Sequence, residues 1–225
     1  MIRRHDSPTT ARWDETPLIR LDTRHRRTRR HRWISPLLLL AGVALVGYVA
    51  ARKAEAAWAQ RWASARLDEA RREAPPAAAP EPEGTPPAPA PRPGEPVARL
   101  EIPRLSVDVV ALEGVDPETL DRGVGHFPGS ALPGADGNAS FAGHRDSFFR
   151  ALQRVAEGDE VRLETPSGEH VYRVTGTRVV GPDEVDVVAP LPGRQLTLVT
   201  CYPFDWIGPA PRRFVVRAAL EEASS

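Results

Sequence analysis

The sequence predicts a mainly β protein, a closed or nearly closed β-barrel with short helices, preceded by a single transmembrane helix and a Pro-rich linker. Three observations support this prediction. Seven short runs of alternating or β-branched residues, separated by turn signals, fill residues 97–225. Nineteen consecutive positions, Trp33 to Ala51, carry no charge. Ten prolines crowd into residues 75–96.

The first 51 residues look like a membrane anchor with a basic leader. Residues 1–32 hold ten Arg against four acidic residues, and we expect them to be a disordered cytoplasmic leader. Residues 33–51 just span a hydrocarbon core at about 1.5 Å per residue. A buried soluble helix and a cleaved signal peptide are the alternatives, although no clear cleavage site follows. The positive-inside rule predicts a single-pass protein of the cell (inner) membrane, with its N-terminus cytoplasmic and its C-terminal domain extracytoplasmic.

Two connecting segments follow the anchor. Residues 52–74, rich in Ala, Arg and Glu, predict a helical neck. Its Trp58 and Trp62 share one face and could sit at headgroup level or in a short coiled-coil contact. Residues 75–96 predict a stiff, extended spacer, because so much Pro cannot build a core. We therefore expect no packed contact between residues 54–96 and the barrel.

The globular domain is expected to cover residues 97–225. Asp116 to Arg122 reads as a capped helical turn, and Ser147 to Val155 as a short helix that starts at a Ser cap. The expected strands are Val97 to Ile102, Val107 to Leu112, Ala139 to Ala142, Glu160 to Leu163, Val171 to Val180, Leu196 to Val199 and Phe214 to Leu220.

Composition argues against several kinds of ligand. Residues 97–225 hold thirteen basic against nineteen acidic residues, whereas a nucleic-acid-binding domain would be basic. The histidines are scattered, and the acidic residues fit no calcium loop. The glycines lie in turns, not in a phosphate-binding motif. We expect no metal, no cofactor and no nucleic acid.

The single cysteine, Cys201, is a candidate nucleophile. It follows the apolar run Leu196 to Thr200 and precedes Tyr202-Pro203-Phe204, so it lies at the end of an expected strand. One cysteine allows no intramolecular disulfide. A buried apolar cysteine is the structural alternative. An external location favours a functional thiol, because an unpaired thiol outside the cytoplasm is a liability without a use.

A cysteine nucleophile usually needs a histidine for proton transfer. The domain has three. His126 lies in an expected loop and is interpreted as structural, and His170 lies beside a turn and is interpreted as solvated. His144 lies where a strand gives way to a helix, and the preceding Gly143 allows close backbone approach. His144 is therefore the favoured partner.

Three segments resemble the sortase family. TLVTC, residues 197–201, resembles the sortase pattern TLxTC. AGHRDSFFRAL, residues 142–152, is similar to the segment that bears the sortase histidine, and PRRFVVRA, residues 211–218, resembles the C-terminal strand with its arginine. The resemblance covers about residues 97–220. CYPF after the strand and the short connection at 191–195 make the chain look most like class D sortases.

The resemblance implies a sortase-type β-barrel and assigns three catalytic residues. Cys201 would be the nucleophile, His144 the general acid/base, and Arg213 the group that holds substrate and oxyanion. Arg212 is the alternative arginine, but alignment on the following Phe-Val-Val favours Arg213, and neighbours on a strand face opposite sides. Asn138 and Asp146 flank the histidine segment as turn or capping residues, or else as groups that support the site.

The implied reaction is that of a membrane-anchored cysteine transpeptidase. It would cleave an LPXTG-like sorting motif near the C-terminus of a surface protein through a thioester at Cys201. The acyl group would pass to an amine of the cell envelope or of another protein. Two rivals remain: a thiol hydrolase that releases the acyl group to water, and a non-catalytic envelope-binding module.

Overall fold

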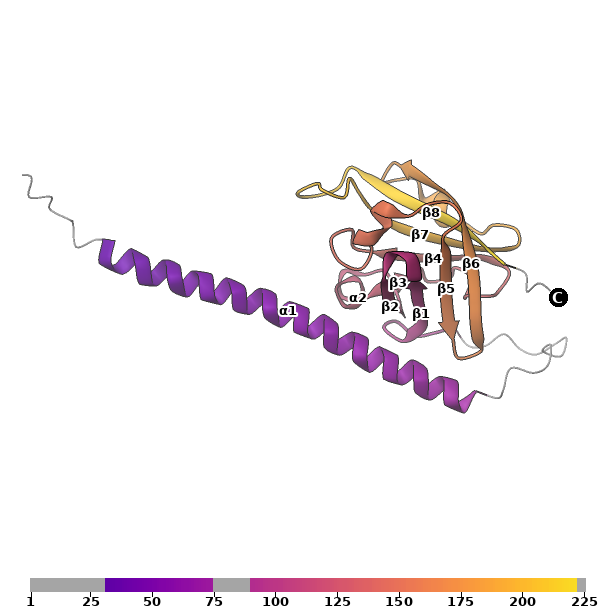
Figure 1. The fold of residues 1–225 in the computed structure, drawn as a ribbon, viewed down its shortest axis with the longest axis horizontal. Coiled ribbons are helices and arrows are strands. Elements are labelled where there is room, and N and C mark those ends of the chain that lie inside the picture. The colour runs from indigo at the N-terminus through magenta and orange to yellow at the C-terminus, as the bar shows by residue number, and fades with distance from the viewer. Residues whose placement is uncertain (1–30, 75–89, 222–225) are drawn as a thin grey trace, which may run out of the picture. The chain divides into compact units, whose positions relative to one another are not determined.

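The computed structural model describes residues 31–74 and 90–221 (Figure 1). The expected leader, except for residues 31 and 32, and most of the expected spacer lie outside these ranges. The chain divides into two compact units, Met1–Val46 and Gly47–Ser225, and the boundary falls inside the long helix α1 (His31–Glu73). Among the described helices, α1 alone has the length and apolar composition to cross a membrane.

The second unit contains a closed eight-stranded barrel, which confirms the predicted fold class. Its strand order is β1-β2-β3-β4-β7-β8-β6-β5, and β5 pairs with β1 to close it. The strands are β1 (Pro96–Ile102), β2 (Val107–Glu113), β3 (Val124–His126), β4 (Gly137–Gly143), β5 (Glu160–Thr165), β6 (Gly168–Val180), β7 (Arg194–Tyr202) and β8 (Arg212–Leu220).

Strand β3 was not predicted, and it contains His126, which the sequence placed in a loop. The loop prediction is wrong. At three residues, β3 is too short to show an alternating pattern. It pairs in parallel with β2 and antiparallel with β4, and so it joins two strands that are distant in sequence.

The capped turn expected at residues 116–122 is confirmed as helix α2 (Pro117–Arg122). The Asp116 carboxylate accepts hydrogen bonds from the backbone N–H of Thr119 at 3.0 Å and from its hydroxyl at 2.6 Å. These bonds hold the pKa of Asp116 below its usual value. Pro117 occupies the first helical position, where a missing N–H costs nothing.

The prediction of a helix from Ser147 to Val155 is wrong about the type of helix and about its first residue. Residues after His144 form a turn, and only Arg150–Arg154 becomes a short 3-10 helix, η2, without a side-chain cap. The Ser147 backbone N–H donates to the His144 carbonyl, so this serine belongs to the turn. Two further 3-10 helices are η1 (Pro103–Leu105) and η3 (Val185–Val188).

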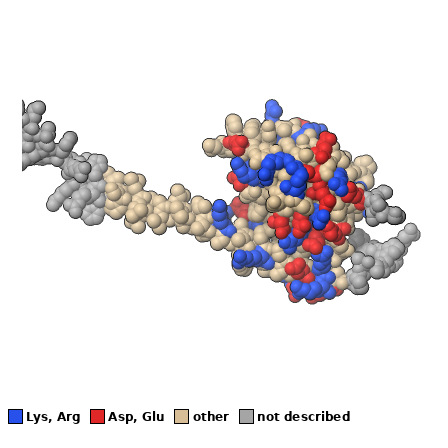
Figure 2. All heavy atoms as spheres, viewed as in Figure 1, with Lys and Arg blue, Asp and Glu red and all other residues tan. Residues whose placement is uncertain are grey.

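The barrel interior is filled by one face of each long strand. Every fully buried Leu or Phe side chain contributes about 1.5–3 kcal/mol relative to exposure. Figure 2 shows basic and acidic side chains interspersed over the visible face of the barrel. The largest fully buried apolar and aromatic side chains are Tyr172, Phe141, Phe149, Leu100, Ile102, Leu152, Leu163, Leu196 and Leu198.

Strand β2 is apolar on both faces because α1 covers its outer face. Val109 and Ala111 join the main core. Val110 and Leu112 alternate with them and therefore point outward, where they pack against the fully buried Ala63 of α1. Ala59 and Leu67, each four residues from Ala63, are also buried and extend this stripe along the helix.

Gln60 fastens the helix to the barrel through its side-chain amide. Its Nε2 donates to the carbonyl oxygens of Val110 and Arg122 at 3.0 and 2.9 Å, and its Oε1 accepts from Val110 N–H at 2.7 Å. Gly123 leaves room for this amide, since a Cβ there would lie 2.6 Å from Gln60 Nε2. At the two ends of the contact, Arg52 pairs with Asp121 and Arg71 with Glu164.

The expectation that residues 54–96 make no packed contact with the barrel is therefore wrong for the helical part. Ala59, Ala63 and Leu67 form an apolar stripe only one side chain wide. In the sequence, such a segment resembles an exposed, Ala-rich helix. Small side chains nevertheless let the helix backbone lie close to the strand. The expectation is also wrong for residues 90–96, because Pro96 begins β1 and Gly94 N–H donates to the Glu113 carbonyl at 2.8 Å. Residues 75–89 lie outside the described residues.

We expect Ala63→Glu to destabilise a soluble fragment of residues 47–225, because it places a charge in the buried contact with Val110 and Leu112. A buried unpaired charge should cost about 2 kcal/mol, or roughly 4–8 °C in unfolding temperature. Ala57→Glu on the exposed side of the same helix is the matched control and should change little. Calorimetry of both variants checks this, and equal unfolding temperatures would show that the helix contributes nothing to barrel stability.

Candidate active site

Three adjacent strands bring the predicted site residues together. In the barrel, β7 lies between β4 and β8. Cys201 of β7 is the direct cross-strand partner of Arg213 of β8. On the other side, Thr200 of β7 is paired in parallel with Gly143 of β4, so Cys201 and His144 are the next residues along their two chains. All three residues thus lie at one end of the barrel.

Cys201 and Arg213 face the outside of the barrel. Directly paired residues share a sheet face, and the next residues on that face, Val199 and Val215, belong to a small cluster separate from the main core. Cys201 is a half-buried free thiol, so the alternative of a core cysteine is wrong. Arg212 is paired with Tyr202, points to the opposite face and is exposed.

The backbone around His144 is fixed from both sides. The Thr200 hydroxyl donates to the Gly143 carbonyl at 2.7 Å, and the Phe149 N–H donates to the His144 carbonyl at 3.0 Å. The ring of Phe149 lies directly under Gly143, where a Cβ would come within 2.7 Å of it. This is the close approach that glycine permits. The His144 side chain itself stays 40% exposed, within reach of a substrate.

Arg145 and Arg213 hold the β7–β8 connection, residues 203–211, which begins just after Cys201. Arg145 Nη2 donates to the carbonyl oxygens of Trp206 and Gly208 at 2.7 and 2.9 Å. Arg213 Nη1 donates to the Ala210 carbonyl at 3.1 Å. The sequence analysis missed Arg145, whose only signal was its place directly after the histidine.

Asn138, near the start of β4, anchors the β6–β7 connection, residues 181–193, at the end of the strands away from Cys201. Its Nδ2 donates to the Ala189 carbonyl at 3.0 Å, and its Oδ1 accepts from the Thr197 hydroxyl at 2.6 Å. Arg217 Nη1 in turn donates to that hydroxyl at 2.7 Å. Burial and the charge of Arg178 lower the pKa of Arg217. Asn138 therefore connects β4 to β7 and to the β6–β7 connection.

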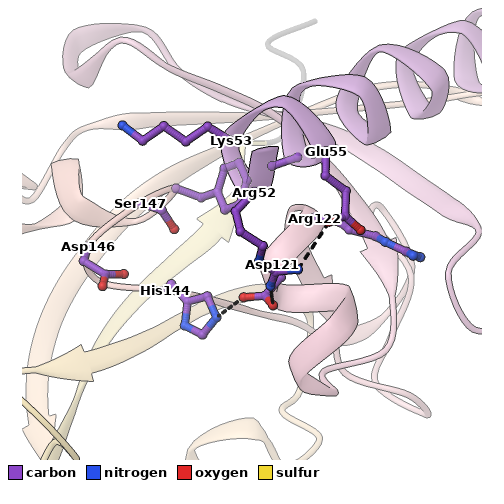
Figure 3. Close-up of a pocket in the computed structure, with 10 residues that line it drawn as sticks. Arg52, Lys53, Glu55, Asp121, Arg122, His144, Asp146 and Ser147 are labelled. Carbon is purple, nitrogen blue, oxygen red and sulfur yellow. Dashed lines mark hydrogen bonds and ion pairs between the residues drawn. The ribbon is translucent and has the colours of Figure 1, made fainter. Parts of the chain in front are cut away.

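A pocket of about 490 Å³ opens beside His144 (Figure 3). Helix α2 contributes Asp121, whose Oδ1 lies 3.6 Å from His144 Nε2. Asp146, from the segment after β4, also lines the pocket, as does Arg52 of α1. Asp121 was missed by the sequence analysis because it precedes His144 by 23 residues and no local pattern connects the two.

The other two histidines of the domain lie away from these strand ends. His126 is buried, with Nδ1 2.6 Å from Glu113 Oε2 and Nε2 3.0 Å from the Ala131 carbonyl, which fits the structural interpretation. The interpretation of His170 as solvated is wrong. It is half-buried against Gly134, its Nε2 has no hydrogen-bond partner within the described part of the chain, and burial lowers its pKa.

No cluster of three or more His, Cys, Asp or Glu side chains in residues 31–74 and 90–221 is arranged to hold a metal ion.

Comparison with known proteins identifies the barrel. A model of the sortase domain matches residues 100–221. The chain is 35% identical to Sortase D of Bacillus subtilis over 124 residues, which cover 55% of this chain and 63% of that protein. It is 37% identical to Sortase SrtE1 of Streptomyces coelicolor over 130 residues, which cover 49% of this chain and 37% of that protein. The chain thus spans less than two thirds of either curated relative.

Solved structures agree with this match. A Clostridium perfringens Sortase D5 transpeptidase superposes with a TM-score of 0.54 at 29% identity, covering 59% of this chain and 82% of that one. Sortase E1 from Streptomyces coelicolor, solved with a tripeptide in the active site, gives a TM-score of 0.54 at 33% identity, covering 59% and 92%. The predicted resemblance to sortases, with class D among the relatives, is confirmed.

Proposed function

Because this chain belongs to the sortase family, we propose that it is a cysteine transpeptidase that cleaves an LPXTG-like sorting motif of a surface protein and transfers the acyl group to an amine. One observation carries the proposal. The only thiol of the chain, an exposed imidazole and a guanidinium converge at the same end of β4, β7 and β8. These are the groups that acyl transfer through a thioester requires.

In the first half-reaction, the Cys201 thiolate attacks the carbonyl carbon of the scissile peptide bond. The C–N bond breaks, a thioester forms, and the His144 imidazolium gives its proton to the leaving amine. In the second half-reaction, an acceptor amine attacks the thioester and loses a proton to His144, while the Cys201 thiolate leaves. The enzyme returns to its starting state, and no cofactor is consumed.

Arg213 is proposed to stabilise the oxyanion of both tetrahedral intermediates. It shares the outer face with Cys201 and cannot lose its proton. Its recorded contacts to the carbonyls of Ala210 and Arg212 involve Nη1 alone, out of five N–H donors. A guanidinium held in this way can point its other donors at a substrate carbonyl without prior reorganisation.

We also propose that the protein is anchored in the cell membrane by residues 33–51, with the barrel on the extracytoplasmic side. The apolar stretch of α1 is not buried against the rest of the described structure, which supports the anchoring. The Arg-rich leader supports the orientation. A catalytic domain outside the membrane would meet both a translocated surface protein and the amines of the envelope.

Product analysis tests the proposed reaction. We expect the fragment 47–225, incubated with a library of LPXTG-like peptides and triglycine, to produce peptides joined to triglycine. Without the amine, the same peptides should be cleaved slowly, because only water can then resolve the thioester. Mass spectrometry distinguishes the products. Hydrolysis of the peptide at the same rate with and without triglycine would indicate a thiol hydrolase. Failure to cleave any of the peptides would favour a binding module.

The two neighbouring arginines provide a matched test of the site assignment. Arg213→Ala should lower kcat/KM by about 100-fold or more, because a lost oxyanion donor costs that much. Arg212→Ala should cost less than about threefold, since it faces away from Cys201. Cys201→Ala and His144→Ala should abolish turnover. Circular dichroism of each variant controls for folding, and a severe loss only in Arg212→Ala would refute the assignment.

Topology can be tested in spheroplasts that express the full chain. A membrane-impermeant protease should degrade the C-terminal domain and leave a tag on the N-terminus protected. A cytoplasmic marker protein must stay intact in the same sample, and both ends must be cut after lysis. A protected barrel together with a digested N-terminal tag would reverse the proposed orientation.

A further inference from the structure

The helix α1 reaches the proposed catalytic site. Its docked part begins at Arg52, directly after the stretch expected to cross the membrane, and runs along the outer face of β2. Arg52, together with Lys53, lines the same pocket as His144 (Figure 3). The segment between membrane and barrel thus touches the environment of the imidazole, although it lies more than 90 positions earlier in the sequence.

Asp121 links the helix to the imidazole. One of its oxygens, Oδ2, pairs with Arg52 Nη2, and the other, Oδ1, lies 3.6 Å from His144 Nε2. The two interactions use different oxygens of one carboxylate, as Figure 3 shows. The arginine therefore restrains the rotation of the carboxylate and keeps Oδ1 directed at the ring.

Hydrogen bonds on both sides of Asp121 hold its backbone in place. Helix α2, which carries it, is capped by Asp116, and the carbonyl of the next residue, Arg122, accepts a hydrogen bond from Gln60 of α1. The same Gln60 side chain pairs with both backbone groups of Val110 in β2. Docking of α1 thus fixes α2 and Arg52 together, and with them the carboxylate.

A carboxylate at Nε2 matters because the two ring nitrogens of a histidine have different tasks. The group bound at one nitrogen sets the ring orientation and leaves the other for proton transfer. The other charged groups that line this pocket are Lys53, Glu55, Arg122 and Asp146, and none of them has a recorded ion pair with His144 within the described residues.

We propose that Asp121 is a positioning residue for His144, and that the docked juxtamembrane helix holds it in place through Arg52. This inference rests on the proposed role of His144 as the acid/base. It makes Arg52 a support of the active site, so that a barrel cut free of this helix is an impaired enzyme.

The test uses the full chain in detergent micelles and a fluorogenic peptide that contains Leu-Pro-Glu-Thr-Gly, with triglycine as acceptor. We expect Asp121→Ala to lower kcat by about tenfold or more with little change in KM, because a misplaced acid/base slows chemistry and not binding. Asp121→Glu should recover part of the loss. Arg52→Gln should lower kcat by several-fold. Arg61→Gln, which removes the same charge from an exposed position of the same helix outside this pocket, is the matched control and should leave kcat unchanged.

A second measurement is independent of the peptide. Because the chain has one cysteine, alkylation by iodoacetamide reports on Cys201 alone. A well-placed imidazole can take the proton of the thiol as the thiol reacts, so Asp121→Ala should slow alkylation in the same direction as His144→Gln, while Arg61→Gln should not.

The outcomes separate this proposal from the proposed function. If His144→Gln retains turnover, the acid/base role itself fails. If His144→Gln is inactive while Asp121→Ala keeps wild-type kcat and alkylation rate, only the positioning role is overturned. A loss in Asp121→Ala that appears in KM alone, or that accompanies a collapse of the circular dichroism spectrum, also overturns it. Loss in Asp121→Ala without loss in Arg52→Gln removes the helix from the proposal.

Discussion

The backbone ladder that joins β4, β7 and β8 is the constraint on which the rest of the site depends. It pairs Cys201 with Arg213 and sets Gly143 beside Thr200, so that three residues scattered over 70 positions of sequence become neighbours. A shift of one residue in either pairing would turn Arg213 to the wrong face of the sheet or separate the thiol from the imidazole. Closure of the barrel makes such a shift costly, because every strand is held on both sides and the interior is filled with buried side chains.

Around this ladder, polar side chains hold the connections between the strands in place. Arg145 ties the β7–β8 connection to the segment after β4, and Asn138 ties the β6–β7 connection to β4 itself. Each uses a side chain to satisfy backbone carbonyls that a strand ladder would otherwise satisfy. Parts of both connections that adjoin β7 are thereby held in defined positions.

The contact between α1 and the barrel is a further constraint, on the helix that precedes the barrel. It is small, since its apolar part consists of Ala and Leu side chains against two residues of β2. Its specificity comes from Gln60, whose amide pairs with backbone groups that lie at the outer face of the barrel. An amide that makes three hydrogen bonds in a half-buried place defines one docked register, because any displacement would leave those backbone groups unpaired.

The sequence by itself determined the mainly β barrel, seven of its eight strands, the apolar helix and the two segments that carry Cys201 and His144. These features are local: they depend on periodicity, on turn residues and on short motifs whose meaning survives without the rest of the chain. Several of the interpretations that failed depended on contacts between distant segments. Strand β3 was too short to show a period, His170 is half-buried against Gly134, and Ala63 packs against β2. The resemblance favoured Arg213 over Arg212, and the tertiary structure shows Arg213 opposite Cys201. Only the tertiary structure placed Asp121 beside His144. Those facts depend on strand register and on the docking of α1 and α2, which arise when distant segments pack together.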